Sequence, residues 1–143
     1  MRPPASCDAT AVAVETVSSF MGRGGFRRLA AATSYSLQGL AAAWRHEASF
    51  RFEVVLGLLL VPLAFWLAPT VAQALLLVGA IVFVWLVELV NSAIETLADA
   101  VSAERHPLIG RAKDIGSAAV LLSLVLAAGA WLAVLWPGLA GRG

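Results

Sequence analysis

Three long apolar runs dominate the sequence and leave little choice of fold. They occupy residues 48–68, 71–98 and 115–136. A bilayer hydrocarbon core about 30 Å thick needs about 20 apolar residues of helix to span it, and a helix satisfies every backbone polar group there. Of all 143 residues, 60% are hydrophobic and only 13% are charged, whereas a soluble domain has about 45–50% and about 25%. We therefore predict an all-α integral membrane protein with three transmembrane helices.

The segment before the first span, residues 26–47, has the pattern of a helix that lies on the membrane surface. Apolar side chains recur there at spacings of three and four residues. They are Phe26, Leu29, Ala30, Leu37, Leu40, Ala41 and Trp44. An amphipathic helix with basic residues and a Trp is suited to the headgroup plane. Residues 1–25 contain no apolar run of the kind found in a signal peptide, so we expect a flexible tail there and a short second tail at 138–143.

A line of polar side chains runs along the end of the second apolar run. Its members are Glu88, Asn91, Ser92, Glu95 and Asp99. At about 100° per residue, these positions fall on one stripe of a helix. Ionisable groups within a membrane helix are costly and by default mark a functional site. We therefore predict a site along this stripe, with Glu88 furthest from water and Asp99 nearest to it.

Basic residues are distributed unequally between the two ends of the spans. They are Arg23, Arg27, Arg28, Arg45 and Arg51 before the first span, and Arg105, Arg111 and Lys113 between the second and the third. The link around Pro69 has none, and only Arg142 follows the third span. Because positive residues favour the cytoplasmic side, we predict that the N-terminus and a polar loop at 101–114 are cytoplasmic and that the C-terminus is periplasmic.

The side chains at this cytoplasmic face suggest a chemistry. The carboxylates are Glu47, Glu53, Glu88, Glu95, Asp99, Glu104 and Asp114, and the cations are Arg28, Arg51, Arg111 and Lys113. Mg²⁺ is commonly bound by one or two carboxylates together with substrate phosphates. Phosphoryl transfer needs such a metal, a cation and a base. A proton or ion pathway also uses intramembrane carboxylates, but here the acids crowd one membrane face and no symmetric repeat is present.

Other function classes find little support. The single Cys7 excludes an intrachain disulfide and a cysteine-based metal cluster. No Walker loop, kinase catalytic loop or dinucleotide fingerprint is present. The sequence has no basic face interleaved with aromatic residues, so nothing in it indicates nucleic-acid binding.

The order of several motifs resembles the bacterial integral-membrane diacylglycerol kinases. The motifs are Tyr35-Ser36-x-x-Gly39-Leu40, Trp44-x-x-Glu47-Ala48-x-Phe50-Arg51-x-Glu53, Glu88-x-x-Asn91-Ser92-Ala-Ile-Glu95-x-x-x-Asp99 and Gly110-Arg111-Ala-Lys113-Asp114-x-Gly116-Ser117. The resemblance runs from about Phe26 to Trp136, and the sequence departs from it at Leu37 and Ile109. It implies one membrane domain at 26–137.

The resemblance also implies an activity and an assembly. A homotrimer with active sites between subunits would transfer the γ-phosphoryl of MgATP to diacylglycerol at the cytoplasmic face of the bacterial inner membrane, giving phosphatidic acid. A related branch of the family phosphorylates undecaprenol instead. The motif around Trp44 and Glu47 looks more like that of the diacylglycerol branch.

The resemblance assigns roles to individual residues. Glu47 and Glu95 would bind the metal, Glu88 would accept the proton of the lipid hydroxyl, and Asn91 would support the site. The nucleotide contacts would be Arg28, Tyr35, Glu47, Glu95, Glu104, Arg105, His106, Lys113 and Asp114. The lipid contacts would be Arg28, Trp44, Ser49, Arg51, Glu53, Trp66, Glu88 and Ser117.

Overall fold

The computed structural model is all-helical and describes residues 25–101 and 106–140. The helices follow in the order α2 (Gly25–His46), α3 (Ala48–Leu67), α4 (Val71–Val101) and α5 (Pro107–Ala140). Helices α3, α4 and α5 are each long and apolar enough to cross a membrane. The prediction of an all-α fold with three membrane-spanning helices is therefore confirmed.

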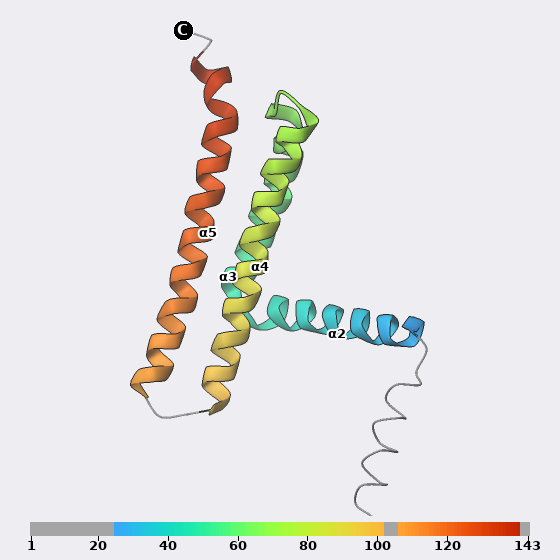
Figure 1. The fold of residues 1–143 in the computed structure, drawn as a ribbon, viewed down its shortest axis with the longest axis vertical. Helices are drawn as coiled ribbons and strands as arrows, with labels where there is room; N and C mark the ends of the chain where they lie inside the picture. Colours follow the sequence, from blue (N-terminus) through green and yellow to red (C-terminus); the bar gives the residue numbers. More distant parts are fainter. Residues whose placement is uncertain (1–24, 102–105, 141–143) are drawn as a thin grey trace, which may run out of the picture. The chain divides into compact units, whose positions relative to one another are not determined.

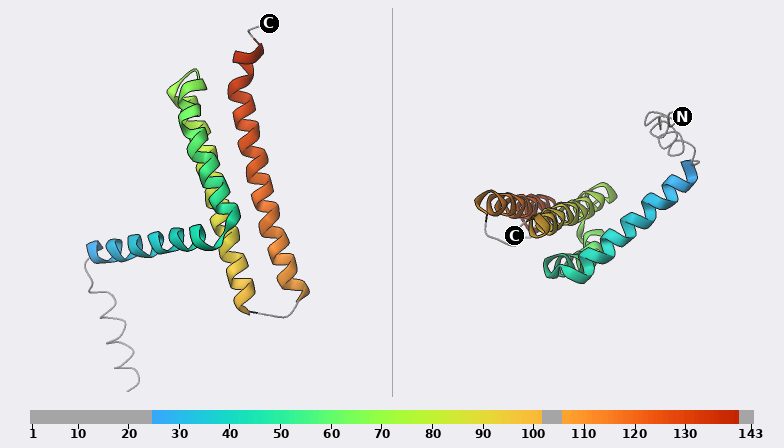
Figure 2. Two further views of the ribbon diagram at one scale, coloured as in Figure 1. Left: turned by 180° about the vertical axis from the view of Figure 1, so that it is seen from behind. Right: turned by 90° about the horizontal axis from the view of Figure 1, so that it is seen from below.

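Helices α3 and α4 run antiparallel because the link between them is very short, and α5 returns alongside α4 (Figures 1 and 2). Helix α3 ends before Pro69, as expected since the residue before a proline disfavours the helical conformation. Helix α4 contacts both α3 and α5. The end of α4 and the start of α5 therefore lie at the same end of this three-helix bundle, and α3 begins partway along α4 toward that end.

The buried face of α4 explains how these helices pack. Its buried residues follow one another at spacings that are mostly three and four. They are Ala74, Leu77, Ile81, Val84, Glu88, Asn91, Ser92 and Ala98. Ala64, Leu77 and Val134 form an apolar cluster from all three helices. The same face of α4 is thus apolar over its first half and polar toward the end shared with the start of α5.

Two boundaries differ from the sequence prediction. The expected loop 101–114 is shorter, since α4 continues to Val101 and α5 begins at Pro107. Proline is favoured in the first turn of a helix, and the imidazole Nδ1 of His106 accepts a hydrogen bond from the Leu108 amide at 3.3 Å. Helix α5 also continues beyond the predicted end at 136, to Ala140. The second and third apolar runs are therefore parts of longer helices, whereas α3 coincides with the first run.

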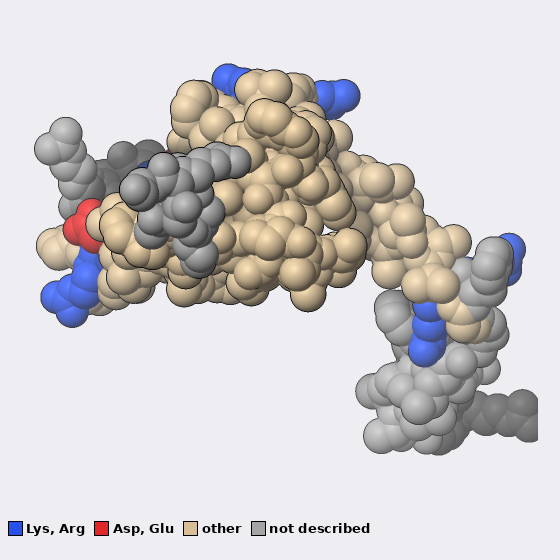
Figure 3. All heavy atoms as spheres, turned by 90° about the horizontal axis from the view of Figure 1, so that it is seen from above, with Lys and Arg blue, Asp and Glu red and all other residues tan. Residues whose placement is uncertain are grey.

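The opposite end of the bundle carries little charge. Ala68, Pro69 and Thr70 form the link there and carry no charge, and in Figure 3, which looks onto this end, most of the surface that is not grey is tan, with Lys, Arg, Asp and Glu at its margins. The contrast with the other end agrees with the unequal charge distribution in the sequence.

Candidate functional site at the polar end of the bundle

The polar stripe of α4 is the continuation of its buried face. Glu88, Asn91 and Ser92 are only 4%, 8% and 7% exposed. Glu95 is half-buried, and the side chain of Asp99 is 71% exposed. Burial within the protein is therefore greatest from Glu88 to Ser92 and least at Asp99.

Carboxylates from three parts of the chain gather around Glu88. Its charge interacts with those of Glu95 on α4 and Glu47 at the junction of α2 and α3. The charge of Glu53 on α3 also interacts with that of Glu88. The antiparallel packing of α3 and α4 causes this convergence, because it places the start of one helix beside the end of the other. We call these four residues the acidic cluster.

Lys113 supplies a positive charge from α5. Its ammonium group donates a hydrogen bond to Asp99 Oδ1 at 2.9 Å, forming an ion pair. Its charge also interacts with those of Glu95 and Glu47. Exposed ion pairs of this kind are screened by water and contribute little to stability. Lys113 can therefore leave Asp99 for a phosphate group at little cost.

Asn91 connects the buried part of the stripe to Glu95. Its Nδ2 donates a hydrogen bond to Glu95 Oε1 at 3.1 Å. Among the residues that the structure describes, three buried side-chain atoms have no hydrogen-bond partner: Glu53 Oε2, Asn91 Oδ1 and Ser92 Oγ. Each such atom costs about 1–3 kcal/mol when it is unpaired. Buried unpaired polar atoms are rare in folded proteins and call for a specific explanation, of which a catalytic or ligand-binding role is one.

The position of Glu47 is fixed at the break between two helices. Glu47 has an extended backbone, with φ −104° and ψ 112°, and α3 begins at the next residue. The guanidinium group of Arg51 donates hydrogen bonds to the backbone oxygens of Trp44 and Arg45, at 3.1 and 3.2 Å. Arg51, to which the family resemblance assigns a lipid contact, thus ties α3 to the last turn of α2 on either side of Glu47.

The donor set suits a metal ion that is shared with a substrate. Within residues 25–101 and 106–140, no three His, Cys, Asp or Glu side chains converge to hold a metal by themselves. Mg²⁺ usually takes one or two protein carboxylates and completes its shell with water and phosphate oxygens. Glu47 and Glu95 both interact with the charges of Glu88 and Lys113, so these two carboxylates fit such a metal bound together with a nucleotide.

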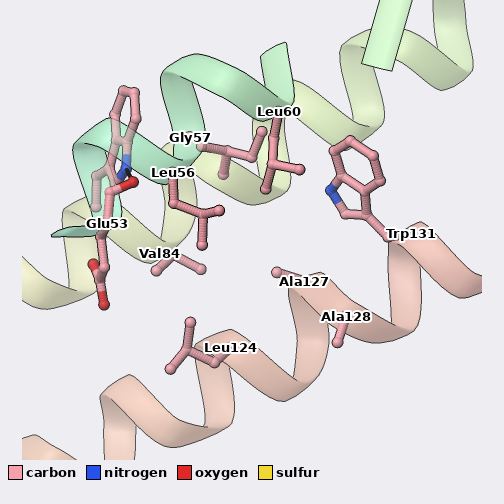
Figure 4. A pocket seen from close by; sticks show the side chains of 11 residues that line it. Glu53, Leu56, Gly57, Leu60, Val84, Leu124, Ala127, Ala128 and Trp131 are labelled. Carbon is pink, nitrogen blue, oxygen red and sulfur yellow. Dashed lines mark hydrogen bonds between the residues drawn. The ribbon is translucent and has the colours of Figure 1, made fainter. Parts of the chain in front are cut away.

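An apolar cavity of about 320 Å³ opens between α3, α4 and α5 beside the acidic cluster. Glu53 lies at one end of it and Trp131 at the other, and Ala127 and Ala128 of α5 form part of its wall (Figure 4). The indole of Trp85 donates a hydrogen bond to the Glu53 backbone oxygen at 3.0 Å. A Cβ at Gly57 would collide with this indole. The cavity therefore begins at a member of the acidic cluster and continues into the apolar part of the bundle.

Other predicted site residues are dispersed. Ser49, His106, Asp114 and Ser117 are exposed, and Trp44 is 44% exposed. Trp66 is 80% exposed and lies about 20 Å along α3 from Glu53. Arg28 and Tyr35 are exposed on the first part of α2. The predicted nucleotide contacts Glu104 and Arg105 lie outside the described residues.

Two residues of the site, Trp85 and Gly116, could not be identified from the sequence alone. Trp85 looks like an ordinary apolar residue of a span, although its indole joins α4 to α3 at Glu53. Gly116 is one of several small residues near the start of α5, and it lies against Asn91. Small residues near a polar stripe signal a close helix contact, yet they do not say which side chain is contacted.

The fold and the site together define a class of protein. It is an integral membrane protein whose acidic cluster and lysine lie at one end of three spanning helices. The cluster also borders an apolar cavity within those helices. Such a site can join a phosphorylated water-soluble substrate to an apolar one.

Comparison with known proteins gives the family. The family model described as prokaryotic diacylglycerol kinase matches residues 34–135. The diacylglycerol kinase of Escherichia coli is 46% identical over 112 residues, which cover 78% of this chain and 92% of the relative. That of Pseudomonas aeruginosa is 44% identical over 118 residues, covering 82% and 96%. That of Haemophilus influenzae is 42% identical over 112 residues, covering 78% and 95%.

The chain therefore belongs to the prokaryotic diacylglycerol kinase family. It is an enzyme of the lipid kinase class, as the resemblance in the sequence implies. Family membership thus favours the enzyme over the proton or ion pathway that the intramembrane carboxylates also allowed.

Proposed function

We propose that the protein transfers the γ-phosphoryl group of MgATP to the hydroxyl of diacylglycerol, giving phosphatidic acid at the cytoplasmic face of the inner membrane. The observation that carries the proposal is the position of Glu88. This residue is 4% exposed and interacts both with Glu53, at the end of the apolar cavity, and with the more exposed Glu95. A lipid hydroxyl arriving from the cavity and a phosphate arriving from water would meet at this carboxylate.

Glu88 is the proposed general base. A base must lie within hydrogen-bond reach of the proton that it accepts, and it typically contributes about 10²–10⁴-fold to the rate. The Glu88 carboxylate is shielded from water. Its oxygens would therefore accept a proton from a bound hydroxyl group rather than from bulk solvent. Asn91 would support this arrangement one helical turn away, through its hydrogen bond to Glu95.

Glu47, Glu95 and Lys113 are the proposed phosphate side of the site. Mg²⁺ bound by the two carboxylates would neutralise charge on the phosphate oxygens. Lys113 is a compact charge on a flexible stem, which suits a phosphoryl group in transit. Its partner Asp99 is exposed and would hold the ammonium group until the nucleotide arrives. Arg28, Tyr35, Glu104, Arg105, His106 and Asp114 are proposed to contact the rest of the nucleotide.

The apolar cavity is the proposed position of one acyl chain of the acceptor. Its volume of about 320 Å³ is within the range of ligand pockets, about 300–1,000 Å³. Glu53, at its end near Glu88, would lie beside the glycerol group. Trp44, Ser49, Arg51, Trp66 and Ser117 are proposed to complete the lipid contacts. Because Trp66 lies at the far end of α3, we propose that it serves the acyl chains rather than the reacting hydroxyl.

The proposed assembly is a homotrimer with active sites shared between neighbouring subunits. Glu47 and Glu95 supply only two ligands, and one protomer brings together no complete metal site within residues 25–101 and 106–140. Ligands from a neighbouring subunit and from the nucleotide would complete it. The charge pattern of the sequence supports a cytoplasmic location for the acidic cluster.

The acceptor is tested by direct competition. Purified protein in mixed micelles is given radiolabelled ATP, Mg²⁺ and equal amounts of diacylglycerol and undecaprenol. We expect labelled phosphatidic acid as the main product. Undecaprenyl phosphate as the main product would reassign the acceptor and keep the kinase, whereas label in neither lipid would contradict the proposed function.

The acyl-chain position gives a second test. Ala127 is half-buried and lines the cavity, so Ala127→Phe should fill part of it. Loss of about 1.4 kcal/mol of apolar burial by the lipid would raise the apparent KM for diacylglycerol about tenfold, with the KM for ATP unchanged. The matched control is Ala133→Phe, because Ala133 is exposed on the same helix. An unchanged lipid KM in Ala127→Phe would place the acyl chain elsewhere.

A further inference from the structure

Gly116 makes an unusually close contact with the side chain of Asn91. Gly116 is buried on α5, and a Cβ atom built on it would overlap Asn91 Oδ1 more closely than real Cβ atoms approach any neighbour. A Cα hydrogen of Gly116 therefore points at this oxygen. By contrast, a Cβ at Gly129 of the same helix would meet nothing. A side chain at residue 116 would therefore force the Asn91 amide on α4 to move.

The contact fixes the orientation of the Asn91 amide. The amide nitrogen donates to Glu95 Oε1 at 3.1 Å, and within the described residues the amide oxygen accepts no hydrogen bond. Both atoms belong to one rigid planar group. Any atom that pushed Oδ1 away from α5 would therefore rotate Nδ2 away from Glu95. The opposite orientation of the amide would place two acceptor oxygens against each other, since a carboxylate only accepts.

We propose that Gly116 is a positioning residue for the metal site. The backbone of α5 at Gly116 acts as a stop for the Asn91 amide, and the amide holds the carboxylate of Glu95 in the orientation that binds the metal. This inference rests on the proposed role of Glu95 as a metal ligand. Groups that hydrogen-bond a metal ligand typically change metal affinity or activity by about 10–100-fold when they are removed.

A purely structural role of Gly116 predicts something different. Small residues let helices approach closely, so a bulkier side chain could simply separate α4 from α5. That effect would lower stability whatever residue stood at 91. The positioning role instead requires that the effect of a change at Gly116 disappears when the Asn91 amide is absent.

Metal binding is the first readout. The full-length protein in detergent micelles is titrated with Mn²⁺ in the presence of a non-hydrolysable ATP analogue, and free Mn²⁺ is followed by electron paramagnetic resonance. Gly116→Ala should raise the Kd of Mn²⁺ about tenfold or more, whereas the matched variant Gly129→Ala should leave it unchanged. In steady-state assays, Gly116→Ala should raise the apparent KM for Mg²⁺, with kcat largely recovered at saturating Mg²⁺.

A double-mutant cycle is the second readout. Asn91→Ala removes the amide, so Gly116→Ala in that background should cause no further loss of Mn²⁺ affinity. If Gly116→Ala alone fails to fold and the double variant folds, the conflict between the added methyl and Asn91 is demonstrated directly. Additive losses, or a double variant that fails to fold when Asn91→Ala folds, would overturn the positioning role.

A wild-type protein that binds no Mn²⁺ with the nucleotide and phosphorylates no lipid would contradict the proposed function. A wild-type protein that does both, with a Mn²⁺ Kd that Gly116→Ala does not change, would contradict only the role of Gly116.

Discussion

Replacing Glu95 by glutamine is expected to reduce phosphoryl transfer to background while the helices remain folded. A neutral amide is a much poorer ligand than a carboxylate for Mg²⁺, which prefers charged oxygen ligands. The packing should survive, because the side-chain oxygen of glutamine can still accept the hydrogen bond that Asn91 Nδ2 now donates to Glu95 Oε1. Glu95 is also only half-buried. Label incorporation into lipid and thermal unfolding in micelles measure the two effects separately.

A second substitution at residue 95 distinguishes charge from packing. Glu95→Asp keeps the carboxylate but shortens the side chain by one methylene group. We expect measurable activity with a raised Mg²⁺ requirement, between those of the wild type and Glu95→Gln. Wild-type turnover in Glu95→Gln would remove Glu95 from the metal site.

Replacing Glu88 by glutamine is expected to lower kcat by about 10²–10⁴-fold, the usual contribution of a general base, with little change in nucleotide affinity. Glutamine has nearly the same volume, so the buried position at 4% exposure is kept. The variant also removes one charge from a group whose members repel one another. Its thermal stability should therefore equal or exceed that of the wild type.

The Glu88 variant needs a binding measurement beside the kinetic one. Equilibrium binding of a non-hydrolysable ATP analogue with Mn²⁺ reports whether the phosphate side of the site is intact. Unchanged binding with a low kcat agrees with a base that acts in the transition state. A collapse of nucleotide affinity would place Glu88 among the metal ligands.

Helical periodicity predicts the site well where a single helix carries it. The stripe from Glu88 to Asp99 follows from spacing alone, and in the structure Glu88 is buried and Asp99 exposed. The reason is that the stripe is the polar half of a face that α4 buries along most of its length. One periodic pattern therefore determines both the packing and the site.

Site residues whose roles depend on contacts between helices could not be predicted in this way. Glu47 occupies the break between α2 and α3, so no periodicity selects it; only the family resemblance did. Its place depends on contacts between segments, among them the hydrogen bonds from Arg51 to the end of α2. The contact of Gly116 with Asn91 likewise depends on the orientation of one amide in the folded protein.

The loop between the second and third spans shows a different limit. Hydropathy marks where a helix leaves the membrane, but not where it ends. Residues 107–114 include Arg111, Lys113 and Asp114 and were predicted as part of a polar loop, yet they form the first two turns of α5. As a consequence, Lys113 is held on a helix opposite Asp99 and is directed toward the acidic cluster.

The central claim is that the acidic cluster serves phosphoryl transfer. It is tested most directly in proteoliposomes of the wild-type protein that contain diacylglycerol, with radiolabelled MgATP outside and a pH-sensitive dye inside. The account predicts labelled phosphatidic acid and no proton flux beyond that of protein-free vesicles. Unlabelled lipid together with a proton flux that Glu88→Gln abolishes would contradict it.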